Sequence, residues 1–261
     1  MKIICTKDYQ SMCRVGANIL SAQIILNPKS VLGLATGSTP LGVYNQLVDW
    51  YKKGDLDFSQ IKSVNLDEYC GLSKNNKQSY YCYMYENFFK HINIDSNSTF
   101  IPNGMEKNVD SECQRYDSIV RKLGGVDYQL LGVGHNGHIG FNEPHTSFEK
   151  ETHCVKLADK TIEANSRFFN SIKEVPTHAY TMGIKSIMKA KKILLLVSGE
   201  SKAEILYEVL FGPIVPTVPA SILQLHNDLT IIADKPALTV ISEKFSGCKN
   251  PPSDAQNLLP T

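Results

Sequence analysis

The chain has 261 residues, of which 42% are hydrophobic and 20% charged, and its formal net charge is +1. This length is enough to bury a full hydrophobic core, and the composition is that of a soluble globular protein. A charge so close to zero provides no overall attraction to nucleic acid or to a membrane surface, so any anion site must be local.

Cysteine usage and the first residues indicate the cellular compartment. The seven cysteines are odd in number and form no Cys-x-x-Cys pair, which argues against a disulfide framework or a zinc knuckle and favours reduced thiols in the cytosol. The opening segment MKIICTKDYQ turns polar too soon for a signal peptide. No apolar run approaches the ~20 residues of a membrane span. We therefore expect a cytoplasmic protein with no nucleic-acid or membrane partner.

Short runs rich in Val, Ile and Leu alternate with stretches of helical spacing. The runs are too apolar for strands with one wet face, which predicts a largely parallel sheet buried on both sides. The strongest runs are residues 31–35, 64–66, 128–133 and 193–197, with weaker ones at 3–5, 180–182 and 229–233.

Helical stripes fill the segments between these runs. Apolar side chains recur on one face from Met12 to Ile24 and again from Leu41 to Tyr51. The alternation predicts an α/β fold with a doubly wound, Rossmann-like sheet and helices on both faces, in a single domain over residues 1–261. The Pro-containing tail at about 250–261 has little periodicity, and we expect it to be a strap or a loose end.

Four polar clusters directly follow the four strongest strands. In an open α/β sheet, ligands bind outside the carboxyl ends of the strands, so parallel strands would bring all four clusters to one edge. This convergence predicts a binding site more strongly than any single motif. The clusters are residues 36–39, 67–69, 134–138 and 198–202.

The first cluster consists of Thr36, Gly37, Ser38 and Thr39, followed by Pro40 at the predicted first position of a helix. Free N–H groups and hydroxyls at a helix N-terminus are typical of a phosphate cradle. No lysine follows the glycine as in a Walker A loop, which disfavours a nucleotide. The alternative is an ordinary capped turn.

The second and fourth clusters provide opposite charges. Asp67 and Glu68 are adjacent at a strand end and so point to opposite faces, which leaves one of them for the pocket as a general base. The other interpretation of such a carboxylate is a helix cap or a loop residue. Lys202 falls in the first turn of a predicted helix, where a positive charge opposes the helix dipole. An anion bound nearby would explain this position, and the alternative is an exposed, solvated lysine.

The third cluster continues into the string GHNGHIGFNEP and carries several groups that exchange protons or bind metals. A metal site would use imidazole and carboxylate ligands, but a Gly-rich loop does not fix two histidines on one helix face. A proton relay needs only one histidine beside a carboxylate, and we favour it. The groups are His135, His138, Glu143 and His145.

Five strings resemble those of the glucosamine-6-phosphate deaminases, in the family's order and at its spacings, over about residues 31–225. They are ATGSTP, NLDEYCGL, GVGHNGHIGFNEP, ANSRFF and SGESKA. The combination of DEY with GHIGFNEP is specific, because the related 6-phosphogluconolactonases share the fold and a Gly-rich GH segment but as a rule do not continue with FNEP.

The resemblance implies conversion of an aminosugar phosphate, glucosamine 6-phosphate, to fructose 6-phosphate and ammonia. His138, with Glu143 and Asn136, would open the pyranose ring. Asp67 would then move a proton from C2 to C1 of the open-chain sugar. No metal or organic cofactor is implied.

The resemblance also assigns the phosphate site and a lid. Residues 36–39, Arg167 and Lys202 would hold the 6-phosphate, and the segment at about 153–182 would form the family's mobile lid. Oligomeric state is left open between a monomer and a homo-oligomer.

Two positions depart from patterns within the family. Many members have Asp where this chain has Asn136, so Glu143 alone would stabilise charge on His138. The regulated bacterial hexamers carry an Arg-x-Lys pair shortly after the NEP string, where this chain has His153 and Val155. We therefore expect no strong activation by N-acetylglucosamine 6-phosphate, unless the nearby Lys150 or Lys156 replaces the pair.

Two rival functions remain at this point. A lactonase acting on a phosphorylated sugar lactone would use the same cradle and a His base on water, without Asp67 as a C2 base. A sugar-phosphate sensor would bind without turnover, but there is no room for a DNA-binding helix-turn-helix before residue 31 and no basic patch.

Overall fold

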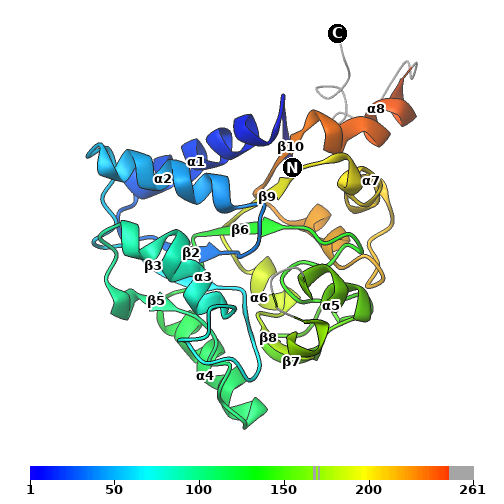
Figure 1. Cartoon of the computed structure of the whole chain (residues 1–261). Coiled ribbons are helices and arrows are strands. Elements are labelled where there is room, and N and C mark those ends of the chain that lie inside the picture. The colour runs from blue at the N-terminus through cyan, green and yellow to red at the C-terminus, as the bar shows by residue number, and fades with distance from the viewer. Residues whose placement is uncertain (167–168, 170, 247–261) are drawn as a thin grey trace.

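The computed structural model describes residues 1–166, 169 and 171–246, which form two sheets with helices packed around them (Figure 1). The larger sheet has seven strands, and every neighbouring pair in it is parallel. In spatial order its strands are β1 (Lys2–Thr6), β10 (Leu229–Asp234), β9 (Lys192–Val197), β6 (Tyr128–Gly132), β2 (Val31–Leu34), β3 (Lys62–Asn65) and β5 (Thr99–Phe100).

Helices cover both faces of this sheet, as the apolar strand runs predicted. One face packs against α1 (Tyr9–Leu26), α2 (Leu41–Lys52) and α3 (Tyr80–Asn87), whose buried side chains meet those of alternate strand residues. The other face packs against α4 (Val109–Lys122), α6 (Ile184–Met188), α7 (Ala203–Phe211) and α8 (Thr239–Phe245).

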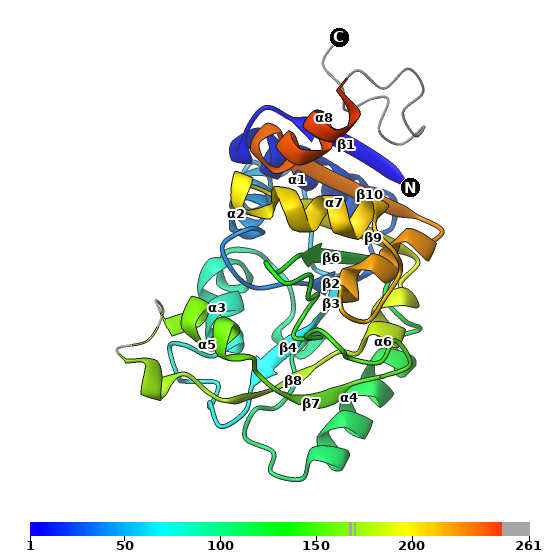
Figure 2. The ribbon, with the colours of Figure 1, turned by 90° about the vertical axis from the view of Figure 1, so that its right-hand side faces the viewer.

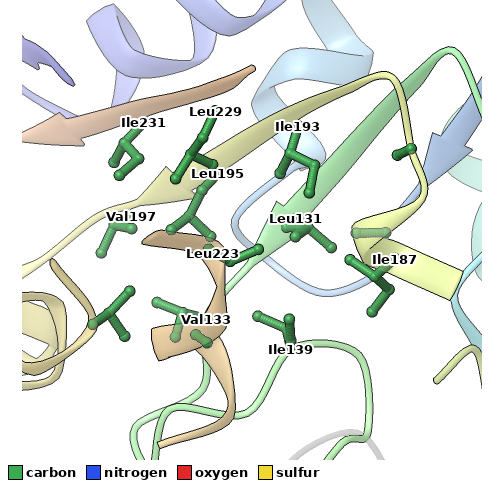
Figure 3. Close-up of a cluster of buried hydrophobic side chains, with 14 of the residues drawn as sticks. Leu131, Val133, Ile139, Ile187, Ile193, Leu195, Val197, Leu223, Leu229 and Ile231 are labelled. Atoms are coloured by element: carbon green, nitrogen blue, oxygen red, sulfur yellow. The ribbon is translucent and has the colours of Figure 1, made fainter. Parts of the chain in front are cut away.

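The core between this second face and its helices shows why the strands are continuous apolar runs in the sequence. Figure 3 shows side chains of β6, β9 and β10, such as Leu131, Leu195 and Ile231, gathered with Ile187 of α6 and Leu223. Their neighbours along each strand point to the opposite core, so both faces are dry. The remaining helical segments are α5 (Asp159–Ser166) and the 3₁₀ turns η1 (Phe89–His91), η2 (Ser96–Ser98), η3 (Ile172–Glu174), η4 (Glu200–Lys202), η5 (Pro219–Leu225) and η6 (Lys235–Leu238).

A second, antiparallel sheet was not expected. It has the order β4 (Asp67–Tyr69), β8 (His178–Thr181) and β7 (His153–Lys156) and lies below the main sheet (Figure 2). The apolar run at 180–182, expected in the parallel sheet, contributes β8, and the polar cluster at 67–69 is itself a strand. An apolar run reports burial on both faces but carries no information about the direction of its neighbours.

The order of connections creates a switch point between β2 and β6. From β2 the chain adds β3 and β5 on one side, and from β6 it adds β9 and β10 on the other. The loops after β2 and β6 therefore leave in opposite directions and open a crevice at the carboxyl ends of the strands. None of the helices in the described part of the chain has the length and apolarity that a membrane crossing requires. The predicted tail at about 250–261 lies outside the described residues.

Candidate active site

A pocket of about 460 Å³ lies at this switch point and is lined from all four predicted clusters. Each lining segment follows a different parallel strand, so the strand ends alone bring the groups together. The predicted site residues that line the pocket are Thr36, Gly37, Ser38, Thr39, Asp67, Asn136, His138 and Lys202.

The loop after β2 is held from behind by two tyrosines. Gly37 has a φ of +95°, which a residue with a side chain rarely adopts. The Tyr83 hydroxyl donates to the Gly37 carbonyl at 2.6 Å, and the Tyr9 hydroxyl donates to the Ser38 carbonyl at 2.9 Å. With the carbonyls held, no protein acceptor within the described chain takes the N–H groups of Gly37, Ser38 or Thr39. The loop therefore offers donors to an anion in the pocket.

The helix after this loop begins one residue later than predicted. Pro40 is the N-cap of α2, with a φ of −79° and a ψ of −8°, and Leu41 is the first helical residue. Because those angles are already helical, the proline still sets the direction in which the helix leaves the loop. The difference leaves the predicted geometry of the loop unchanged.

Lys202 reaches the pocket from the loop after β9. Asp234, at the end of β10, fixes this loop by accepting hydrogen bonds from the Ser198 hydroxyl and, at 3.0 Å, from the Gly199 N–H. Asp234 also accepts from the Ala237 N–H at 3.0 Å and so caps η6. One buried carboxylate thus positions the turn that carries the cation.

Asp67 provides a buried carboxylate in the pocket lining. It is the first residue of β4 and is only 6% exposed. Burial, together with the neighbouring charge of Glu68, raises the pKa of Asp67 to about 8. A carboxylate whose pKa lies near neutrality is suited to accept and return a proton during a reaction.

Glu68 faces away from the pocket, as the alternation along a strand requires. Its carboxylate accepts hydrogen bonds from the backbone N–H groups of Tyr69, Tyr80 and Tyr81 at 2.8–2.9 Å. Glu68 therefore caps α3, which is the second interpretation of the pair, and Asp67 is the carboxylate that lines the pocket.

Glu143 lies beside the His138 ring and is itself held by two hydrogen bonds. Its Oε2 is 3.6 Å from the His138 Nδ1 and accepts from the Asn136 amide at 2.7 Å. Its Oε1 accepts from the Thr161 hydroxyl at 2.5 Å. Burial alone would raise the pKa of Glu143, but the His138 ring, Thr161 and Asn136 lower it to about 2. Glu143 is therefore a permanent negative charge beside the imidazole.

The His138 ring packs flat against the backbone of its own loop. A Cβ atom at Gly134 would lie 2.2 Å from the His138 Cε1, so only glycine fits there. Asn142 ties the following turn to β8 by donating to the carbonyls of Ile139 and Met182 at 2.8 and 2.9 Å. These contacts explain why Gly134 and Asn142 occur in the string GHNGHIGFNEP.

The pocket lining also contains side chains to which the sequence assigned no role. Tyr80, in the first turn of α3, stacks on Phe141 with an angle of 10° between the rings, and both line the pocket. Thr161 lines it from α5, within the predicted lid. No local pattern marks Tyr80 or Thr161, because each reaches the site through packing between elements distant in sequence, whereas Phe141 lies within the string GHNGHIGFNEP. Arg167, predicted for the phosphate, lies outside the described residues.

The histidines of the third cluster do not gather. His138 approaches Glu143, whereas His135 contacts the Ser201 hydroxyl at 3.4 Å. The backbone N–H of His145 donates to the Pro216 carbonyl at 2.7 Å. Among the residues that the structure describes, no three His, Cys, Asp or Glu side chains are grouped as metal ligands.

Comparison with known proteins identifies relatives over nearly the whole chain. The family described as glucosamine-6-phosphate isomerases/6-phosphogluconolactonase matches residues 9–232. A glucosamine-6-phosphate deaminase from Lachnoclostridium phytofermentans is 60% identical over 232 residues, which covers 89% of this chain and 98% of the relative.

Solved structures separate the two branches of that family. A monomeric glucosamine-6-phosphate deaminase superposes with a TM-score of 0.89 at 48% identity, over 91% of this chain and 98% of its own. A 6-phosphogluconolactonase from Thermotoga maritima has a TM-score of 0.70 at 18% identity, over 89% of this chain and 98% of its own, and so shares the fold alone. In sequence and in structure, the chain belongs to the glucosamine-6-phosphate isomerase/6-phosphogluconolactonase family.

Proposed function

We propose that the protein is a glucosamine-6-phosphate deaminase, which converts glucosamine 6-phosphate and water to fructose 6-phosphate and ammonia. The observation that carries the proposal is the convergence of an anion loop, a buried carboxylate and a histidine–glutamate pair in one pocket. The relative that is 60% identical bears the same name.

Ring opening is the first step of the proposed reaction. His138 takes the proton of the anomeric hydroxyl and returns a proton to the ring oxygen, which breaks the C1–O5 bond and gives the open-chain aldehyde. Glu143, whose low pKa keeps it ionised, stabilises the charge that forms on the imidazole. Asn136 orients Glu143 through its 2.7 Å hydrogen bond and adds no second charge.

Enolisation follows on the open chain. Asp67 removes the proton from C2 while O1 takes a proton from the substrate's own ammonium group, which gives an enolamine. Asp67 then returns its proton to C1, which leaves an iminium at C2. Water adds to C2, and the nitrogen departs as ammonia. Besides these proton transfers, the scheme breaks the C1–O5 and C2–N bonds and adds one water, so the named side chains and water supply all the groups that it uses.

The decisive experiment is an assay of ammonia release from glucosamine 6-phosphate by the purified protein, with and without EDTA. We expect ammonia and fructose 6-phosphate in equal amounts, and the same rate with the chelator. An absence of turnover, or an activity lost with EDTA, contradicts the proposal. Hydrolysis of 6-phosphogluconolactone, measured in parallel, tests the lactonase, which is only a distant structural relative.

Residues 36–39, Lys202 and Arg167 hold the 6-phosphate in this proposal. Lys202→Ala and Arg167→Ala are each expected to raise KM about tenfold or more with a smaller effect on kcat, because a charge-assisted contact contributes on the order of 1.5–3 kcal/mol. The Arg167 variant should lose more, since a guanidinium can bind two phosphate oxygens.

Steady-state kinetics checks this prediction. Lys189→Ala is the matched control, because Lys189 pairs with Glu151 on the surface, away from the pocket. An unchanged KM in both the Lys202 and the Arg167 variants means that the phosphate binds elsewhere.

The site expected to lack an activator pair lies on β7. Burial lowers the pKa of His153, whose Nδ1 lies 2.9 Å from the Glu151 carbonyl, so the ring is neutral at pH 7. Val155 offers no donor. We therefore expect substrate saturation to be hyperbolic and unmoved by N-acetylglucosamine 6-phosphate, because an effector shifts an equilibrium only through differential binding. A sigmoidal curve made hyperbolic by the effector contradicts this expectation.

The lid and the cellular setting are further parts of the proposal. The segment at about 153–182 closes over the sugar, and Thr161 on α5 connects it to Glu143. The protein acts in the cytoplasm on a small aminosugar phosphate without metal, cofactor or nucleic acid. A monomeric state is supported by the 48% identical neighbour, which is a monomeric deaminase.

A further inference from the structure

Glu68 is a buried carboxylate that the proposed reaction does not use. It is 3% exposed and lies next to Asp67 on β4, with its side chain directed away from the pocket. Backbone N–H groups surround its carboxylate: Oε1 accepts from Tyr69 at 2.8 Å and Tyr80 at 2.9 Å, and Oε2 accepts from Tyr81 at 2.9 Å. A neutral side chain would suffice to fill space, so a buried charge at this point calls for an explanation.

The contacts of Glu68 join the strand of Asp67 to the helix of Tyr80. The N–H groups of Tyr80 and Tyr81 are the first two of α3, where orphan donors and the helix dipole favour a negative charge. Tyr80 carries the aromatic wall of the pocket and stacks on Phe141. The clamp therefore fixes how far the Tyr80 ring lies from Asp67.

Glu68 is the charged neighbour that acts on Asp67. Burial raises the pKa of Glu68 to about 7, against the three N–H bonds, which lower it. Tyr80 on α3 and Tyr116 on α4 are neutral, because burial raises the pKa of each well above its usual value. The strand partner on β8, Thr181, does not titrate. Among the described residues, the other titratable side chains that line the pocket are His135, His138 and Lys202.

We propose that Glu68 is a positioning residue for the proton transfer at C2: it clamps the N-terminus of α3 against β4 and places a second buried negative charge beside Asp67. That charge makes Asp67 a stronger base than burial alone would, because a like charge nearby disfavours the ionised form. A stronger base abstracts a proton from carbon more readily. This inference rests on the proposed function, since it assigns Asp67 the role of base.

The pH dependence of kcat/KM tests the inference with glucosamine 6-phosphate as substrate. In the wild type we expect kcat/KM to rise with pH and to level off above about 8, where Asp67 is ionised. In Glu68→Gln the rise should move to lower pH by about 1 unit, and the plateau rate should fall several-fold as the base weakens. Titration of the substrate amine is common to all variants and cancels in the comparison.

Two control variants separate charge from clamping. Ser79→Ala removes the cap of the same helix, because the Ser79 hydroxyl accepts from the Cys82 N–H at 3.1 Å, but it leaves the charge beside Asp67 unchanged. We expect lower thermal stability and an unmoved pH profile. Glu68→Asp keeps the charge but shortens the reach to α3, so its profile should stay near that of the wild type while kcat falls.

The inference is overturned by an active wild type in which Glu68→Gln leaves the pH profile unmoved, or in which Ser79→Ala moves it equally. An inactive wild type instead overturns the proposed function. If Glu68→Gln does not fold, carboxyl carbon NMR of the wild type gives the answer. The Asp67 signal should titrate in two steps, one shared with Glu68, because coupled groups respond to each other. A single-step curve for Asp67 contradicts the inference.

Discussion

Asp67→Asn is expected to lower turnover of glucosamine 6-phosphate by ~10²–10⁴-fold, because loss of a general base typically has an effect of that size. Binding should survive, since Asn has nearly the same size as Asp and the anion loop is a separate segment of the pocket lining. The expected pattern is a large fall in kcat with KM within a few-fold of the wild type. A variant with wild-type kcat would show that another group takes the C2 proton.

The same substitution should also stabilise the protein at alkaline pH. The pKa of Asp67 is raised by folding, from an ordinary value near 4 to about 8. Because the pKa is higher in the folded state, the free energy of unfolding falls as the pH rises towards the pKa of Asp67 in the folded protein. Above that pH the buried carboxylate must be charged. An asparagine side chain cannot ionise, so the variant avoids this loss.

Thermal melts at pH 5 and pH 9 measure the effect. We expect the free energy of unfolding of Asp67→Asn to exceed that of the wild type by at least ~1 kcal/mol at pH 9 and by less at pH 5. Asp127→Asn is the control at the other end of the strands, where Asp127 accepts from the Val31 N–H at 2.7 Å and pairs with Lys191. That variant should lose stability and keep its turnover, which separates a functional carboxylate from a structural one.

Features that repeat along the chain could be predicted from the sequence. The seven apolar runs all become strands. A strand buried on both faces needs a continuous run of apolar residues, and only the edge strand β1 among the seven is largely accessible. Polar clusters after four such runs then had to converge, since parallel strands end at the same edge. The short edge strand β5, with only Thr99 and Phe100, carries no such pattern.

Features that depend on packing between distant segments could not be predicted in this way. Whether β8 joins the parallel sheet or a separate one depends on partners that its own run does not specify. Tyr80 reaches the pocket because Glu68 caps its helix, and Thr161 because α5 lies over Glu143. Neither contact has a local signature, whereas the strings of the family carried the roles of Asp67, His138 and Glu143 as expectations.

His138→Asn is the second change for which a large effect is expected. Asparagine can hydrogen-bond to the sugar but cannot carry a proton from the anomeric hydroxyl to the ring oxygen. We expect kcat to fall by ~10²–10⁴-fold, with KM changed little because the phosphate contacts remain. Glu143→Gln should act in the same direction, since it removes the negative charge 3.6 Å from the His138 Nδ1.

The role in ring opening distinguishes His138 from Asp67. Fructose 6-phosphate is partly open in solution. When the enzyme acts on it in the reverse direction, in D₂O with ammonium, incorporation of deuterium at C1 therefore depends on Asp67 and only in part on ring opening by the enzyme. His138→Asn should therefore lose more of the forward rate than of deuterium incorporation at C1. Asp67→Asn should lose both in proportion. Equal losses in the two assays for His138→Asn would mean that the histidine acts in the enolisation itself, and that the ring opens by another group of the pocket.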